Sequence, residues 1–189
     1  MSGSDQAHWD GRWAEAEPPG DPDPWLPELD EMLPRSGRAV DLAGGQGRNS
    51  LWLAARGLDV TIVDVSPVGL VRASAAAAER GLELATEARD LPADGPPPGP
   101  WDVALIVRYL DRDLVRAVPS ALSPGGLLAF TQPTVTNLER HDHPRAEFLL
   151  GMGEMAALAD ELDDVEVVQL TEDWTPQGTH EARLVIRKR

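Results

Sequence analysis

The residues with the clearest capacity for chemistry form a glycine-rich stretch, Asp41-Leu-Ala-Gly-Gly-Gln-Gly-Arg-Asn49. Gly44, Gly45 and Gly47 place backbone without Cβ atoms where a strand is expected to turn into a helix, so a ligand can approach the main chain closely. About twenty residues downstream, Asp64 ends a second strand, and in a doubly wound sheet a carboxylate there can accept both hydroxyls of a ribose. The spacing therefore predicts a nucleoside-binding site.

The glycine spacing argues against a dinucleotide. A dinucleotide fingerprint reads Gly-x-Gly-x-x-Gly, but counting from Gly45 the last of these positions is Ser50. Asp41 would repel a phosphate and attract an ammonium or sulfonium group. The only lysine is Lys188, in the basic tail, so a Tyr-x-x-x-Lys reductase pair is absent from the sequence. A nicotinamide-binding oxidoreductase remains the first alternative, and a protein that binds its cofactor without turnover is the second.

The elements that must position these residues alternate along the chain. Strands are expected at 38–42, 59–64, 82–86, 101–107 and 126–131. Helices are expected at 49–56, at 68–80, between the fourth strand and about residue 122, and at 153–162. The proline-rich segment 92–100 is expected to be a loop instead of a helix. Two final strands, 165–170 and 181–186, have no helix between them and predict an antiparallel hairpin. The pattern indicates an α/β fold with a seven-stranded, mostly parallel sheet, helices on both faces and the last strand antiparallel.

Composition excludes several classes of chemistry. The chain has 189 residues and no cysteine, which rules out disulfides, thiolate metal sites and cysteine nucleophiles and favours a cytoplasmic protein. Its formal net charge of −15 would repel nucleic acid. No apolar run is long enough to span a membrane. We therefore expect a small-molecule substrate, no nucleic-acid or membrane partner, and a monomer or homodimer.

The stretch Asp41–Ala54 together with Val60–Ser66 resembles the class I S-adenosylmethionine-dependent methyltransferases, and in particular their tellurite-resistance and thiopurine methyltransferase-like branch. The likeness spans roughly residues 9 to 186. It implies a Rossmann-like sheet of order 3-2-1-4-5-7-6 and S-adenosyl-L-methionine as the cofactor. The family motif Asp/Glu-x-Gly-x-Gly-x-Gly is matched except at its first glycine, where this chain has Ala43.

The resemblance also implies which residues contact the cofactor. The glycine turn and Asp41 would hold the methionine end, Asp64 the ribose, and the residues after Asp64 and at 90–91 the adenine. The segment Trp9-Asp-Gly-Arg-Trp13 resembles the family's opening motif, whose helix lies over the cofactor, although ordinary packing of a terminal helix is the alternative. Residues 1–37 would then be a helix and Pro-rich acidic arm packed as a lid, and 38–189 the cofactor-binding domain. The predicted contacts are Trp9, Trp13, Asp41, Ala43, Gly44, Gly45, Gly47, Asn49, Asp64, Val65, Ser66, Asp90, Leu91, Val107 and Arg108.

Methyl transfer from a sulfonium mainly requires that two reactants be aligned and water excluded. A general base is needed only where the acceptor must lose a proton. Candidate catalytic residues are Arg108 and Tyr109, after the fourth strand, and His143 in the following polar loop. No metal site is expected from His141, His143 and Glu139, because alternate residues on a loop lack a regular ligand spacing. The acceptor is predicted to be a small thiol, metalloid oxyanion or hydroxyl compound.

Overall fold

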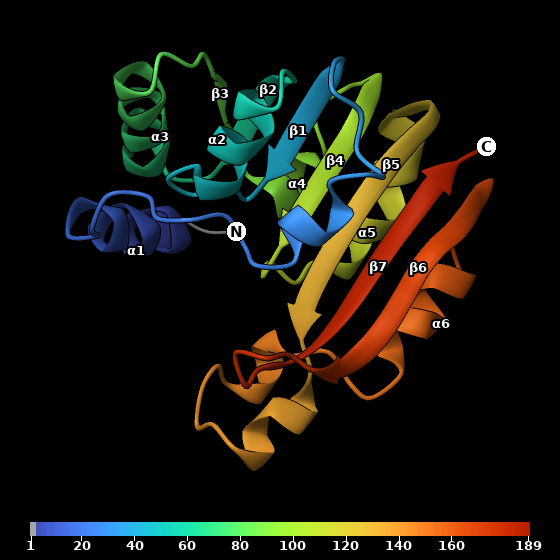
Figure 1. The fold of residues 1–189 in the computed structure, drawn as a ribbon. Coiled ribbons are helices and arrows are strands. Elements are labelled where there is room, and N and C mark those ends of the chain that lie inside the picture. Colours follow the sequence, from blue (N-terminus) through green and yellow to red (C-terminus); the bar gives the residue numbers. More distant parts are fainter. Residues whose placement is uncertain (1–2) are drawn as a thin grey trace.

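The computed structural model describes residues 3–189, and within them the strands form one seven-stranded sheet of order β3-β2-β1-β4-β5-β7-β6 (Figure 1). Strands β1 to β5 run parallel, while β7 is antiparallel to both of its neighbours. The predicted fold class and strand order are thus confirmed. The strands are β1 (Arg38–Leu42), β2 (Asp59–Asp64), β3 (Ala85–Ala88), β4 (Trp101–Val107), β5 (Leu122–Pro133), β6 (Val165–Trp174) and β7 (His180–Lys188).

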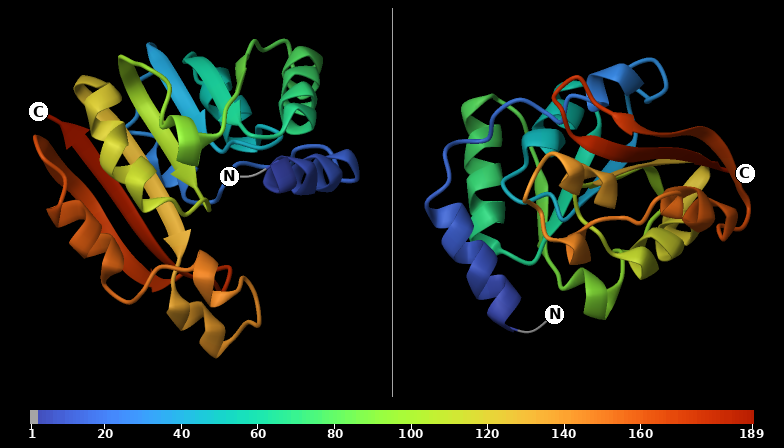
Figure 2. Two further views of the ribbon diagram at one scale, coloured as in Figure 1. Left: turned by 180° about the vertical axis from the view of Figure 1, so that it is seen from behind. Right: turned by 90° about the horizontal axis from the view of Figure 1, so that it is seen from below.

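Helices cover both faces of the sheet (Figure 2), because successive strand residues point to opposite sides and each side is apolar. One core contains Ile106 and Phe130 beneath α4, α5 and α6, and the other contains Leu105 and Trp25 beneath α2 and η1. The helices are α1 (Gly3–Ala14), η1 (Leu26–Leu29), α2 (Arg48–Ala55), α3 (Pro67–Glu79), α4 (Leu91–Asp94), α5 (Arg112–Ala117), η2 (Val118–Ala121), η3 (Val135–Glu139), η4 (Ala146–Phe148) and α6 (Glu154–Asp160).

Three local predictions are wrong in detail. The segment 92–100 is not all loop: its start belongs to the single turn α4, where the Asp90 side chain accepts a hydrogen bond from the Ala93 amide and Pro92 occupies a first-turn position that needs no N–H. The third strand begins at Ala85, later than expected. The stretch 124–126, expected as a turn before the fifth strand, lies inside β5 at an irregularity opposite β4.

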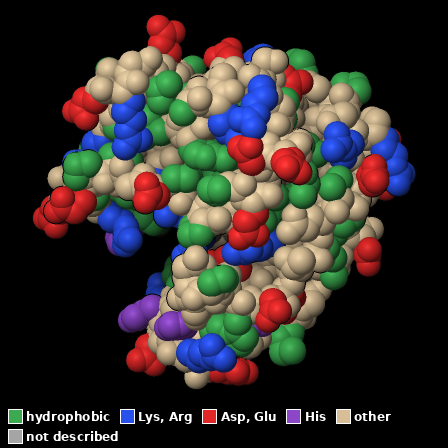
Figure 3. Space-filling view, viewed as in Figure 1, with side chains coloured by type: hydrophobic (Ala, Val, Ile, Leu, Met, Phe, Trp, Pro, Cys, Tyr) green, Lys and Arg blue, Asp and Glu red, His purple; other side chains and the backbone are tan. Residues whose placement is uncertain are grey.

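Two segments stand over the carboxyl edge of the sheet, where β1, β2 and β4 end. Helix α1 lies beside α3, and residues 134–150 form a lobe with the β6–β7 turn (Figure 1). The lobe is tied to the sheet by a hydrogen bond of 2.7 Å between Thr134 Oγ1 and His180 Nδ1. Figure 3 shows the surface hollowed between the part that carries α1 and this lobe. Among residues 3–189, no helix has the length and apolarity needed to cross a bilayer.

Candidate cofactor site at the carboxyl edge of the sheet

The turn from β1 into α2 leaves no room for a side chain at its three glycines, Gly44, Gly45 and Gly47. The Gly44 amide donates to the Val63 carbonyl at 3.1 Å, which holds the turn against β2. A Cβ on Gly44 would lie 2.7 Å from Ile62, and one on Gly47 would lie 2.8 Å from Ala73. Gly45 and Gly47 adopt φ of 59° and 85°, which glycine reaches without strain. Tight packing from behind therefore brings bare backbone to the front of the turn.

Asp64 closes the floor of the same turn. Its carboxylate accepts hydrogen bonds from the Gly45 amide at 2.7 Å and the Ser66 amide at 2.9 Å, and the residue is 6% exposed. Burial raises the pKa of Asp64, while the amide hydrogen bonds lower it in part. The two amides fix the orientation of the carboxylate, so its remaining lone pairs are preorganised for a ligand.

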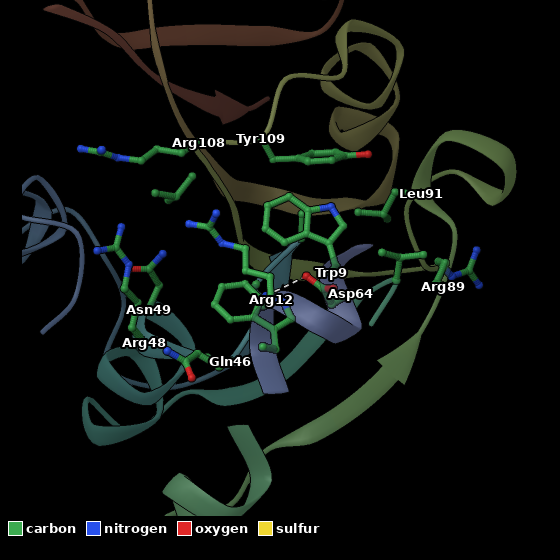
Figure 4. Close-up of a pocket in the computed structure, with 17 residues that line it drawn as sticks. Trp9, Arg12, Gln46, Arg48, Asn49, Asp64, Arg89, Leu91, Arg108 and Tyr109 are labelled. Atoms are coloured by element: carbon green, nitrogen blue, oxygen red, sulfur yellow. Dashed lines mark hydrogen bonds between the residues drawn. The ribbon is translucent and has the colours of Figure 1, made fainter. Parts of the chain in front are cut away.

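A cavity of about 420 Å³ opens over the turn and Asp64. This volume falls within the range of roughly 300 to 1,000 Å³ that is typical of small-molecule sites. In Figure 4, Asp64 lies in the middle, with Arg48 and Asn49 toward one end and Leu91 and Arg89 toward the other. The lining residues come from α1, the glycine turn, the starts of α2 and α4, and the ends of β2, β3 and β4: Trp9, Arg12, Trp13, Ala43, Gly44, Gly45, Gln46, Gly47, Arg48, Asn49, Asp64, Val65, Arg89, Leu91, Val107, Arg108 and Tyr109.

Asp41 is placed differently from the prediction. Its carboxylate does not line the cavity but lies beneath Gly44, where it accepts a hydrogen bond of 2.6 Å from Ser50 Oγ. The residue is 1% exposed, and this burial, offset in part by Ser50, raises its pKa to about 6. Asp41 therefore supports the turn from behind.

Three more predicted residues lie outside the cavity lining. Ser66 is fully buried at the start of α3, where its side chain accepts from Gly69 and donates to Asp10. Asp90 caps α4. His143 is exposed on the lobe. The other predicted residues, from Trp9 to Tyr109, all line the cavity. Among residues 3–189, no three His, Asp or Glu side chains are grouped to hold a metal ion.

Four lining residues were not predicted: Arg12, Gln46, Arg48 and Arg89. Three of these lie within the quoted motifs, so the motifs carried the signal, but their side-chain directions could not be read from the spacing. Arg89 had no such signal. It is held by Glu87 and by the carbonyls at the end of α4.

Helix α1 forms one wall of the cavity through two stacked indoles. The Trp9 and Trp13 rings lie 5.8 Å apart at 22°. A Cβ on Gly45 would lie 2.5 Å from Trp13, and one on Gly69 would lie 2.9 Å from it, so glycines on both the turn and α3 admit this indole. Asp10 fastens the helix by accepting the Ser66 hydroxyl at 2.5 Å, at the positive end of α3.

Tyr109 and Arg108 differ in what they can do. The Tyr109 ring is half-buried, and burial followed by nearby carboxylates raises the pKa of its hydroxyl well above the usual value. Its phenol therefore stays protonated and can donate a hydrogen bond, but it is a poor base. The Arg108 guanidinium extends away from Asp64 (Figure 4) and pairs with two buried carboxylates, Asp23 and Glu181.

The sheet order 3-2-1-4-5-7-6 is the one that the resemblance to class I S-adenosylmethionine-dependent methyltransferases implies. Residues 39–126 match the family described as "Methyltransferase domain". A ubiquinone biosynthesis O-methyltransferase of Caulobacter sp. (strain K31) is 34% identical over 99 residues, a match that spans 48% of this chain and only 38% of that protein. The resemblance predicted from the glycine turn and Asp64 is thus confirmed.

Solved structures share the fold at low identity. A structure described as the conversion of a disulfide bond into a thioacetal group during echinomycin biosynthesis aligns with a TM-score of 0.73 at 17% identity, covering 97% of this chain and 92% of that one. A TehB-like SAM-dependent methyltransferase from Corynebacterium glutamicum ATCC 13032 aligns with a TM-score of 0.67 at 19% identity over 100% of both chains. Within the described residues, 3–189, the shared fold therefore extends beyond the residues matched by the family.

Proposed function

We propose that the protein transfers a methyl group from S-adenosyl-L-methionine to a small acceptor. The observation that carries the proposal is the Asp64 carboxylate, held by two amides at the floor of a cavity bounded by side-chain-free backbone. A carboxylate fixed in this way suits a pair of ribose hydroxyls. The glycine cradle suits a ligand that lies against the main chain, since a Cβ at Gly44 or Gly47 would collide with the packing behind it.

The remaining residues divide the cavity into two ends. Leu91 offers apolar contact to a purine on one side of Asp64, and Arg48 and Asn49 offer polar contact on the other (Figure 4). When bound, S-adenosyl-L-methionine supplies a methyl group on a positively charged sulfur. The chain's own part is to orient the reactants and exclude water, which can lower a barrier by about 7 to 11 kcal/mol. Trp9 and Trp13 of α1 serve as the lid over residues 38–189.

The cavity wall favours an acceptor that arrives already nucleophilic. Among the described residues, those that line it include no histidine, lysine or glutamate. The one lining carboxylate, on Asp64, is engaged by amides, and the raised pKa of Tyr109 keeps its phenol protonated. Thiolates, metalloid oxyanions and ionised hydroxyls need no proton removed during attack. The name of the Caulobacter relative adds support for an oxygen acceptor of this kind.

The proposal is tested by incubating the protein with S-adenosyl-L-methionine and a panel of thiols, selenite, tellurite and phenols, and following S-adenosylhomocysteine by mass spectrometry. With at least one acceptor, we expect one methylated product for each S-adenosylhomocysteine released. The rate should rise with pH as the ionised fraction of that acceptor rises. Cofactor binding without turnover on any acceptor would favour the binding-only alternative instead. The acidic surface supports a small acceptor, because it would repel a nucleic-acid substrate. The absence of cysteine from the sequence favours a cytoplasmic site of action.

A further inference from the structure

A buried carboxylate on the proline-rich arm joins two arginines at one end of the cavity. Asp23 lies between α1 and η1 and is 1% exposed. Its Oδ2 accepts from Arg48 Nη2 and from Arg108 Nε, both at 3.2 Å. Arg48 begins α2 and Arg108 follows β4, so one arm residue ties together two segments that are far apart in the chain.

The backbone amide and the second carboxylate oxygen of Asp23 are also hydrogen-bonded. Its amide donates to Asn49 Oδ1 at 2.9 Å, and its Oδ1 accepts from the Trp25 amide at 3.2 Å. Arg108 is fixed further by Glu181 of β7, which is 2% exposed and accepts from Arg108 Nη2 at 2.6 Å. Arg108 also adopts φ of 56°, a conformation that a residue with a Cβ holds only under constraint. These contacts together fix the positions of both guanidinium groups.

Both arginines keep donors for a ligand. A guanidinium has five N–H groups, and the carboxylates of this network engage Nη2 of Arg48 and Nε and Nη2 of Arg108. Both side chains line the cavity and are still exposed, Arg48 by 39% and Arg108 by 42%. The free N–H groups of these two guanidiniums line the cavity side by side, so they can donate hydrogen bonds to an anionic oxygen group of a ligand.

We propose that Asp23 is a positioning residue, which holds Arg48 and Arg108 so that their free N–H groups bind a carboxylate or similar oxyanion of a ligand in the cavity. The inference rests on the proposed function, in which that group belongs either to the amino-acid end of the cofactor or to the acceptor. Asp23 does not touch the ligand. It acts by fixing the two guanidiniums before the ligand arrives, which reduces the ordering that binding would otherwise require.

The test compares two nucleosides by isothermal titration. S-Adenosylhomocysteine carries a carboxylate, whereas 5′-methylthioadenosine has the same thioether nucleoside without the amino-acid end. The variant Asp23→Asn keeps the side-chain shape but loses the charge. The matched control is Asp30→Asn, since Asp30 lies on the same segment and pairs with Arg35 and Arg56, which do not line the cavity. A second arm titrates acetate into each S-adenosylhomocysteine complex.

If the anionic group is the carboxylate of the cofactor, we expect Asp23→Asn to weaken the binding of S-adenosylhomocysteine about tenfold, which is the scale of one charge-assisted hydrogen bond. The binding of 5′-methylthioadenosine should then weaken by less than about twofold. If the anionic group belongs to the acceptor, Asp23→Asn should bind both nucleosides with unchanged affinity but lose the binding of acetate. Asp30→Asn should change neither readout. Arg48→Gln, at a more exposed side chain, should reproduce the Asp23 result and serves if Asp23→Asn does not fold.

The proposal is overturned if neither readout distinguishes Asp23→Asn and Arg48→Gln from the control. It is also overturned if Asp23→Asn weakens both nucleosides equally, because a general loss of structure would do that. Failure of the proposed function looks different: the unaltered protein would then bind neither S-adenosylhomocysteine nor 5′-methylthioadenosine, or it would bind S-adenosylhomocysteine but methylate none of the acceptors.

Discussion

Replacing Asp41 by asparagine should make the protein more stable at neutral pH, although it removes a residue of the family motif. Asp41 is 1% exposed beneath the glycine turn, and burial raises its pKa from the usual 3.8 to about 6. Ser50 Oγ donates to Asp41 Oδ2 at 2.6 Å, a hydrogen bond that an asparagine carbonyl can also accept. The substitution therefore removes a buried charge while keeping its partner.

The sign follows from proton linkage. A carboxyl whose pKa is raised by folding binds protons more tightly in the folded state, so its contribution to stability falls as pH rises through the window from 3.8 to about 6. With these two pKa values, the contribution falls by about 2 kcal/mol between pH 4.5 and 7.5 and by about 3 kcal/mol in total. The asparagine side chain does not titrate, so the stability of the Asp41→Asn variant relative to the natural protein should rise by about 2 kcal/mol over that range.

Urea unfolding at pH 4.5 and 7.5 measures this double difference, in which the other titrating groups cancel. Asp59→Asn, at the exposed start of β2, is the control for the loss of a carboxylate outside the core. A double difference near zero for Asp41→Asn, or one of opposite sign, would refute the assignment of Asp41 as a carboxyl that is costly to ionise behind the turn.

Two further substitutions probe the cavity wall. Gly45→Ala should destabilise the protein by about 1 to 2 kcal/mol more than Gly81→Ala in urea unfolding, because both glycines have positive φ but only a Cβ at Gly45 would meet Trp13. Equal losses would contradict the packing of α1 on the turn. Tyr109→Phe should slow methyl transfer only about fivefold, the value of one hydrogen bond. A loss of about 100-fold or more, with a rate limb at alkaline pH in the natural protein, would identify Tyr109 as a base.

The strands of the sheet were predictable because the residues that end them act locally in the sequence. Glycine and proline mark the ends of the elements, and the β-branched run at 59–64 has a strand signal that no neighbour overrides. The turn α4 was missed because the prolines after it dominated the prediction, whereas its formation depends on one capping side chain, Asp90. Similarly, the glycines at 125–126 suggested a turn, but the ladder to β4 continues past them.

The site was predictable only where backbone decides it. The glycine turn and Asp64 meet because parallel strands end at one edge of the sheet, as expected. The direction of each side chain was not predictable. Asp41 turns inward to Ser50, and Asp23 meets Arg108 across 85 residues, a pairing with no local signal in the sequence.

The most direct test of the account is the binding of S-adenosylhomocysteine and NAD to the natural protein and to Asp64→Ala and Asp64→Asn, measured by isothermal titration. We expect the natural protein to bind S-adenosylhomocysteine and not NAD. Loss of the ribose contacts in Asp64→Ala should weaken binding at least about tenfold, and Asp64→Asn, which keeps one acceptor oxygen, should fall between the two. Binding of NAD alone, or unchanged affinity in Asp64→Ala, would contradict the assignment of this cavity.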